Sequence, residues 1–120
     1  MSNTGNIIKY FLNILDTVKL YHWTTTSYAR HKASDKLHEK LSVLVDKFVE
    51  IYIGKYGRPL TLKNIDIGNY ENFELYLKEI GQTLVELSLL LNKDFDQDFI
   101  NLVAEIQGNI NQTLYLFTLN

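Results

Sequence analysis

Apolar residues recur every three or four positions through most of the chain, a spacing that is typical of amphipathic helices. The first run predicts a helix from about Thr4 to about Trp23, and the second predicts one from about Tyr28 to about Tyr56. Each helix therefore presents one apolar stripe to a core. The stripes consist of Ile7, Ile8, Phe11, Ile14, Leu15 and Val18, and of Leu37, Leu41, Leu44, Val45, Phe48, Ile51 and Tyr52.

Two further helices are predicted in the second half of the chain. One runs from about Tyr70 to about Leu91 behind an Asn69 cap. The other opens where Gln97 follows Asp94 by three positions, in the manner of a capping box. Their inward residues are Phe73, Leu77, Ile80, Leu84, Leu87 and Leu91, and Phe99, Val103, Ile106, Ile110 and Leu114.

Turn-forming residues separate these helices. Residues 24–27 are four hydroxyl side chains that supply an N-cap, and the run Gly57-Arg58-Pro59 stops the second helix. Residues 60–68 form a connector whose brief alternation fits either a turn of helix or an extended crossing. Helices joined by short links predict an all-α fold, an antiparallel four-helix bundle that occupies residues 1–120 as one domain.

The amino-acid composition excludes several classes of function. A chain of 120 residues with 46% apolar residues can bury a core without disulfides, and the absence of cysteine excludes thiolate chemistry. A net charge of -2 provides no general attraction for polyanions, so we expect no nucleic-acid partner. No apolar run is long enough to cross a membrane and no signal-peptide pattern opens the chain, so we expect a cytoplasmic protein. Phosphate-binding loops and nucleophile elbows are absent too.

Polar residues of the second helix form a stripe of unusual chemistry. All three histidines and the single tryptophan lie between Tyr21 and Glu50. At about 100° per residue, one sector of roughly 100° collects four side chains, namely His31, Asp35, Asp46 and Glu50, with His38 beside them. The lysines occupy a different sector: Lys32, Lys36, Lys40 and Lys47. Because a solvated face normally mixes its charges, this separation indicates a site for a metal cation.

Spacing limits how such a site can form. His31 and Asp35 are one turn apart, as are Asp46 and Glu50, but eleven residues, roughly 16 Å, separate the two pairs. The third and fourth helices contain no histidine and no Glu-x-x-His, which an intrachain di-iron bundle needs. A second, antiparallel copy of the helix would join the pairs and create two equivalent sites. We therefore expect a homodimer or a higher homo-oligomer that associates through this helix.

The same segment resembles the Dps mini-ferritins, a branch of the ferritin-like superfamily. Their signature begins with a His-Trp pair, here His22-Trp23, and continues with His31, Asp35, Asp46 and Glu50 at the family's intervals of four, eleven and four. The link from the first to the second histidine is about three residues shorter here. In that family the two histidines and the first acid come from one subunit, and the last two acids come from its two-fold mate. The resemblance covers about 30 residues.

This resemblance implies a ferritin-like fold and a ferroxidase-type activity. Fe(II) would be bound and oxidised at an intersubunit site, either di-iron or mononuclear, which sequesters iron and protects against peroxide. The implied ligands are His22, His31, Asp35, Asp46 and Glu50, with Trp23 and His38 around them. Mn or Zn are alternative metals for the same donors.

A second hypothesis uses the same helix faces without iron chemistry. A ferritin-like bundle that lacks ferroxidase activity can act as a structural or interaction protein, for example as a viral or phage accessory protein. The shorter link, the short chain and the missing Glu-x-x-His favour this hypothesis. His22 would then bond a terminal carbonyl, and Trp23 would pack in a core or an interface.

Overall fold

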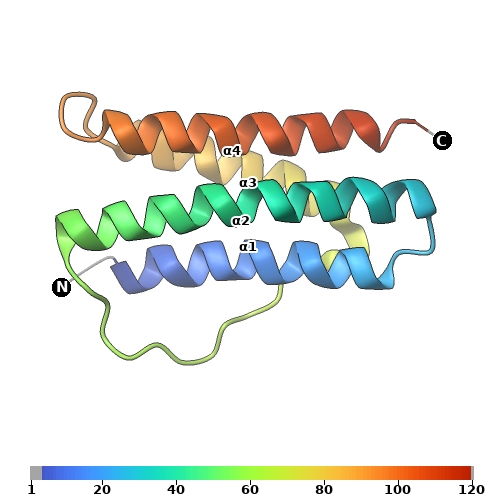
Figure 1. Ribbon diagram of the computed structural model, residues 1–120, viewed down its shortest axis with the longest axis horizontal. Helices are drawn as coiled ribbons and strands as arrows, with labels where there is room; N and C mark the ends of the chain where they lie inside the picture. The colour runs from blue at the N-terminus through green and yellow to red at the C-terminus, as the bar shows by residue number, and fades with distance from the viewer. Residues whose placement is uncertain (1–3, 120) are drawn as a thin grey trace.

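Four α-helices and one short 3-10 helix make up the regular structure of residues 4–119, the part of the chain that the computed structural model describes. Figure 1 shows them side by side: α1 (Thr4–Thr24), α2 (Tyr28–Tyr56), η1 (Tyr70–Asn72), α3 (Phe73–Leu90) and α4 (Gln97–Leu116). These residues form no strand, so the predicted all-α class is confirmed. None of the helices within residues 4–119 combines the length and the apolar character that a membrane crossing requires.

Most helix ends lie where the sequence predicts them. The side chain of Ser27 accepts a hydrogen bond from the Arg30 N–H at 3.2 Å and so caps α2. Gly57 closes α2 at a φ of 96°, a value that glycine adopts without strain, and its N–H donates to the Ile53 carbonyl at 2.8 Å. Asn69 caps the third predicted helix, which begins with the 3-10 turn η1 and continues as α3.

The predicted capping box of Asp94 and Gln97 is wrong. Asp94 lies in the turn before α4, where its N–H donates to the side chain of Asn92 at 2.8 Å. The Asp96 carboxylate in turn accepts from the Asn92 N–H at 2.9 Å. These local side-chain bonds close the turn between α3 and α4 and leave α4 to begin at Gln97 without a side-chain cap.

The connection between α2 and α3 determines the topology. Residues 57–69 contain no helix and run back along the outside of α1, so α3 begins at the same end of the molecule as α2 and runs parallel to it (Figure 1). Of the two predicted forms of this connector, the extended crossing is therefore correct. The expectation of short links throughout is wrong, because this link must cover more than half of α1, from Thr4 beside Gly57 to Thr17 beside Gly68.

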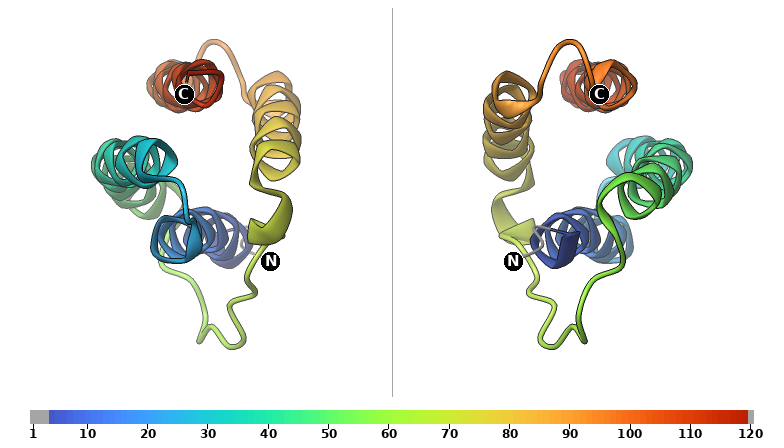
Figure 2. Two further views of the ribbon diagram at one scale, coloured as in Figure 1. Left: turned by 90° about the vertical axis from the view of Figure 1, so that its right-hand side faces the viewer. Right: turned by 90° about the vertical axis from the view of Figure 1, so that its left-hand side faces the viewer.

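Viewed along their axes, α2 and α3 stand at opposite corners of the arrangement (Figure 2). Direct helix packing joins α1 to α2, α2 to α4, and α3 to α4. α1 meets α3 through η1 and through stacked rings, those of Tyr21 and Phe73, whose centroids lie 4.0 Å apart. Neighbouring helices are antiparallel, so each apolar stripe faces the common centre.

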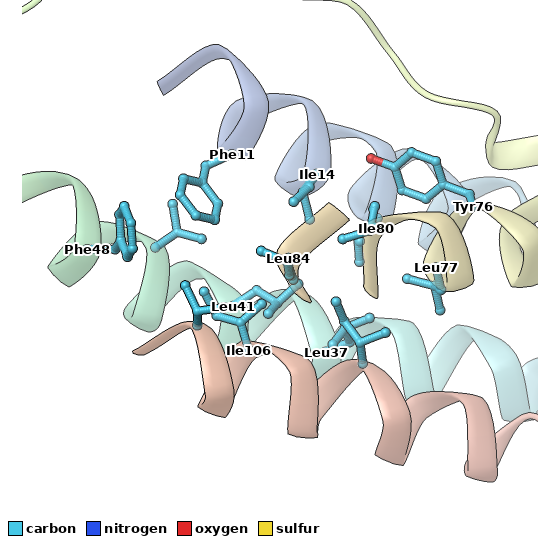
Figure 3. Packing of buried hydrophobic residues seen from close by; sticks show 14 of the residues in the cluster. Phe11, Ile14, Leu37, Leu41, Phe48, Tyr76, Leu77, Ile80, Leu84 and Ile106 are labelled. Atoms are coloured by element: carbon cyan, nitrogen blue, oxygen red, sulfur yellow. The ribbon is translucent and has the colours of Figure 1, made fainter. Parts of the chain in front are cut away.

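Side chains from all four helices fill that centre. Figure 3 shows Phe11 and Ile14 of α1 with Leu41 and Phe48 of α2 in this core. The ring of Phe48 lies 4.9 Å from the ring of Phe11 and 4.8 Å from that of Phe99. Most of the predicted inward residues are buried, and the remainder lie half-buried at its margin: Ile7, Ile8, Leu15, Leu44, Ile51, Tyr52, Leu87, Leu91 and Leu114.

Polar contacts hold the crossing against α1. The Asn13 side chain donates to the Asp66 carbonyl at 2.7 Å, and the Gly68 N–H donates to the Thr17 hydroxyl at 2.8 Å. A Cβ at Gly68 would lie 2.1 Å from a ring carbon of Tyr76, which itself donates to Asn13 Oδ1 at 2.6 Å. Only glycine therefore fits where the crossing passes this ring.

Buried Asp96 ties the end of α2 to the turn between α3 and α4. Its carboxylate accepts from the Tyr56 hydroxyl at 2.9 Å and lies 3.2 Å from Lys55 Nζ. The Asn92 N–H first, and then Tyr56 and Lys55, lower the pKa of Asp96 below its ordinary value of 3.8.

We predict that Asp96 makes folding more stable above pH 4 than below it. Because its folded pKa is lower than its unfolded pKa, its contribution is present above about 3.8 and is lost as the pH falls through the folded value. Asp96→Asn should lower the free energy of unfolding at pH 7 by about 1–3 kcal/mol, since it weakens several hydrogen bonds to a buried charge. Denaturant unfolding at pH 7 and pH 3 measures both effects.

The matched control is Asp94→Asn, because Asp94 is exposed in the same turn. This variant should unfold like the wild type at pH 7. If Asp94→Asn and Asp96→Asn lowered the free energy of unfolding equally, the role of Asp96 would be contradicted.

Candidate functional site

A link of three residues, Thr25 to Ser27, joins α1 to α2. The Thr25 N–H continues the last turn of α1 by donating to the Tyr21 carbonyl at 2.9 Å. So short a link leaves α1 and α2 in contact from their first shared turn. As a result His22, near the end of α1, meets His31, in the first turn of α2.

His22 and His31 form a reciprocal pair. Nδ1 of His22 lies 2.8 Å from the His31 carbonyl oxygen, and Nδ1 of His31 lies 2.8 Å from the His22 carbonyl oxygen. The two rings are stacked with their centroids 3.9 Å apart and their planes 16° from parallel. Because a carbonyl oxygen can only accept, Nδ1 carries the hydrogen in both rings. In the neutral form each Nε2 therefore keeps a lone pair, which is the form of imidazole that binds metals.

Asp35 adds a carboxylate to this pair. Its Oδ1 lies 3.7 Å from Nε2 of His22, whose side chain is buried. When His22 is neutral, two acceptor atoms face each other there, and a proton or a cation between them would relieve the repulsion. Two ligands of a tetrahedral ion with bonds of about 2.1 Å lie about 3.4 Å apart, so the observed separation is close to that of two metal ligands.

His38 lies one turn beyond Asp35 and is half-buried. The Ser42 hydroxyl donates to the His38 carbonyl at 2.8 Å and lies 3.4 Å from its Nδ1. Burial first, and then the charge of Lys19, lowers the pKa of His38 below 6.5. His38 is therefore neutral at pH 7 and borders the pair without contacting it.

Asp46 and Glu50 lie farther along α2, on its exposed side. The Asp46 carboxyl, through hydrogen bonding and charge, raises the pKa of Glu50 above its ordinary value. Asp46 also lines a shallow hollow of about 190 Å³ between α1 and α2, whose other walls include Leu12, Leu15 and Val49. The Asp46 carboxyl therefore borders a mainly apolar hollow and interacts with Glu50 one turn farther along α2.

The predicted ligands thus fall into two groups within one chain. His22, His31 and Asp35 come together at the turn between α1 and α2, whereas Asp46 and Glu50 remain roughly 16 Å away along the straight helix. Within residues 4–119, no three His, Asp or Glu side chains are arranged to hold a metal ion. One chain therefore offers two incomplete sets of ligands.

Trp23 does not pack in the core of the chain, contrary to one of its two predicted roles. Its side chain is 68% exposed, and Lys19 Nζ lies 5.7 Å from its ring. The helix turns by about 100° between His22 and Trp23, so these two side chains point in different directions.

Ser34 is a residue of this region that the motif does not contain. It is fully buried, and its hydroxyl donates to the Arg30 carbonyl at 2.8 Å and to the His31 carbonyl at 3.2 Å. The His31 oxygen therefore accepts from both Ser34 and His22. A hydroxyl three positions after a histidine is too common a pattern to reveal this contact from sequence.

We predict that the neutral forms of His22 and His31 both carry their hydrogen on Nδ1, whereas free histidine favours Nε2. Long-range proton–nitrogen NMR of the protein at pH 8 distinguishes these tautomers directly. His38, whose Nδ1 has no carbonyl partner among the described residues, serves as the internal control. An Nε2–H tautomer at His22 or His31 would contradict the reciprocal bonds.

Comparison with known proteins places the chain in a family. Its similar proteins include an uncharacterized 14.6 kDa protein from the mobD-ri intergenic region of Enterobacteria phage T4, which is 29% identical over 113 residues, covering 91% of this chain and 86% of that protein. No solved structure matches the chain. The model of a family of unknown function, DUF5856, matches residues 22–117, from His22 through α4 to Phe117. The chain therefore belongs to the DUF5856 family.

Proposed function

We propose that two copies of this protein bind Fe(II) between antiparallel α2 helices and oxidise it, in the manner of the Dps-like proteins that the sequence resembles. The observation that carries this proposal is the reciprocal pair, which holds two imidazoles in their metal-binding tautomer with the Asp35 carboxylate beside one of them. Imidazole nitrogen and carboxylate oxygen are ligands that suit Fe(II).

The positions of the ligands along α2 support a two-fold arrangement. The interval from His31 to Glu50 and the interval from Asp35 to Asp46 share one midpoint, between Lys40 and Leu41. A two-fold axis near that midpoint would set His31 of one copy opposite Glu50 of the other, and Asp35 opposite Asp46. Both incomplete sets of ligands would then be completed at once, at two equivalent sites.

The surface around these ligands also favours a second copy. The groove between α1 and α2 exposes parts of Ile8, Leu12, Leu15 and Val49, which a partner helix would bury. The Asp46 carboxyl raises the pKa of Glu50, first through a hydrogen bond and then through its charge, and a cation between the copies would favour the charged form of both carboxyls.

The topology supports a ferritin-like fold. Ferritin-like bundles contain one long crossover connection, whereas simple up-and-down bundles contain none. Here residues 57–69 provide one such crossing, between the second and third α-helices (Figure 1).

Iron is the substrate in this proposal. Two Fe(II) ions give one electron each to hydrogen peroxide, which takes up two protons and yields two waters and two Fe(III) ions. His22, His31 and Asp35 of one copy, with Asp46 and Glu50 of the other, would hold the metal, and the Nδ1 bonds would fix the ring orientations. Mn(II) and Zn(II) would compete for the same donors.

A structural or interaction role without iron is the second candidate. The similarity to an uncharacterized phage protein suits an accessory role of this kind. In that case the polar stripe of α2 would serve as a polar interface between copies.

Mixing two inactive variants tests the shared site. His31→Ala/Asp35→Ala lacks one half of each site, and Asp46→Ala/Glu50→Ala lacks the other, so neither should bind Fe(II) as the wild type does. A mixed dimer regains one intact site of two, so an equimolar mixture should recover about a quarter of wild-type binding if the copies exchange at random. Anaerobic Fe(II) titration and the absorbance of Fe(III) after peroxide provide the readouts, and no recovery in mixed dimers of confirmed composition would refute the shared site.

The second candidate predicts a different result for Asp46→Ala/Glu50→Ala. A metal site predicts lost iron binding with an unchanged mass of the metal-free protein, whereas a polar interface predicts a smaller mass. Sedimentation of the metal-free variant beside the wild type separates the two roles. Glu71→Ala/Asp94→Ala, in η1 and in the turn before α4, provides the control for the loss of two exposed carboxylates, because neither residue belongs to a proposed interface.

A further inference from the structure

A second face of α2, away from the histidines, borders a groove against α4. The groove contains two hollows, of about 480 and 380 Å³, which share Glu39 and so follow the two helices without a break. Small and apolar side chains from both helices and from the C-terminal turn line it, namely Ala29, Ala33, Val43, Leu44, Leu116 and Leu119. Val43 is 68% exposed, so this lining is open to a partner.

A lysine row follows the same groove. Lys32, Lys36 and Lys40 occupy successive turns of α2 and are exposed, and none of them forms an ion pair with another described residue. The opposite wall of the groove is formed by α4 and the C-terminal turn. It adds no positive charge, because no Lys or Arg follows Lys93 in the chain. Asp35, Glu39 and Glu105 also line the groove, so the lysines form a row and not a uniform basic patch.

The outer face of α3 has the complementary character. At about 100° per residue, a sector of roughly 80° contains Leu75, Glu79, Gln82, Glu86 and Leu89. Both glutamates are exposed and unpaired among the described residues, and Leu89 is 78% exposed. The adjacent Leu90 is 84% exposed as well. Exposed leucines of this size on a water-facing helix indicate a surface that a partner covers.

We propose that the outer face of α3 of one copy docks into the groove between α2 and α4 of a second copy. The leucines of α3 would fill the apolar groove, and Glu79 and Glu86 would meet the lysine row. The spacing fits, since Glu79 and Glu86 are about 10.5 Å apart along α3, and Lys32 and Lys40 are about 12 Å apart along α2. Lys78, beside the glutamates, has Glu39 and Glu105 of the groove as further partners.

This contact is head-to-tail. α2 and α3 stand at opposite corners of the molecule, so the two complementary faces point in opposite directions (Figure 2). Each copy can therefore receive one neighbour and dock onto another, which builds a ring or an open row and not a closed dimer. The contact uses the lysine sector of α2 and leaves Asp46 and Glu50 free. It shares Asp35 with the proposed iron site, because Asp35 lines the groove as well.

Charge reversal with mixing tests this proposal. Lys36→Glu/Lys40→Glu makes the groove acidic, and Glu79→Lys/Glu86→Lys makes the α3 face basic. Each variant alone then opposes like charges, and its head-to-tail association should weaken at least about tenfold. In an equimolar mixture the two variants can alternate, and every groove then meets an α3 face of opposite charge. The large species should therefore return. Sedimentation velocity over a range of concentrations, at low and high salt, measures this association.

The control is Lys63→Glu/Lys93→Glu, which changes the net charge equally but lies in the crossing and in the turn before α4. It should associate like the wild type. Circular dichroism verifies that each variant is folded; all the altered side chains are exposed.

Two results would overturn the proposal. One is a wild-type protein that never exceeds a dimer at low salt, and the other is a mixture that remains as small as its separate variants. Because iron binding is read out separately, a wild-type protein that titrates iron normally but never exceeds a dimer would refute this contact alone.

Discussion

The three-residue link between α1 and α2 is the constraint on which the rest of the structure depends. It is too short to let the helices separate, so they pack antiparallel from their first shared turn. The carbonyls of His22 and His31 lie at this turn, and each one is bonded by the other residue's imidazole. One local contact thereby joins two helices and determines the tautomer of two histidines.

α2 then organises the molecule through three different faces. Its apolar stripe packs against α1 and α4, its stripe of histidines and carboxylates faces outward beside α1, and its lysines border the groove toward α4. The long crossing makes this possible, because it carries the chain to the far corner and leaves both polar faces of α2 uncovered (Figure 2). A short link would have placed α3 antiparallel and adjacent to α2, over one of these faces.

Both proposed contacts follow from this incomplete coverage. The histidine pair with Asp35 and the pair of Asp46 and Glu50 are each too small to hold a metal, yet their spacing suits a two-fold partner. The lysine row and the outer glutamates of α3 are complementary but point apart, which suits a head-to-tail neighbour. The similarity to a phage protein of nearly the same length is compatible with either an iron-binding or a purely structural assembly.

Hydrophobic spacing by itself determined the helices and most of the core, because a helix that must bury one face repeats its apolar residues every three or four positions. The sequence also predicted the caps of α2, because the Ser27 hydroxyl can accept from a helix N-terminus and Gly57 tolerates a positive φ. Only the tertiary structure decided the route of residues 57–69, because the contacts of Asn13 and Thr17 that hold it lie some 50 residues away in the chain. It also decided the turn at Asp94, the exposure of Trp23 and the meeting of His22 with His31. The motif predicted a set of candidate ligands. Their orientation depended on backbone carbonyls and on neighbouring helices, which no spacing of side chains encodes.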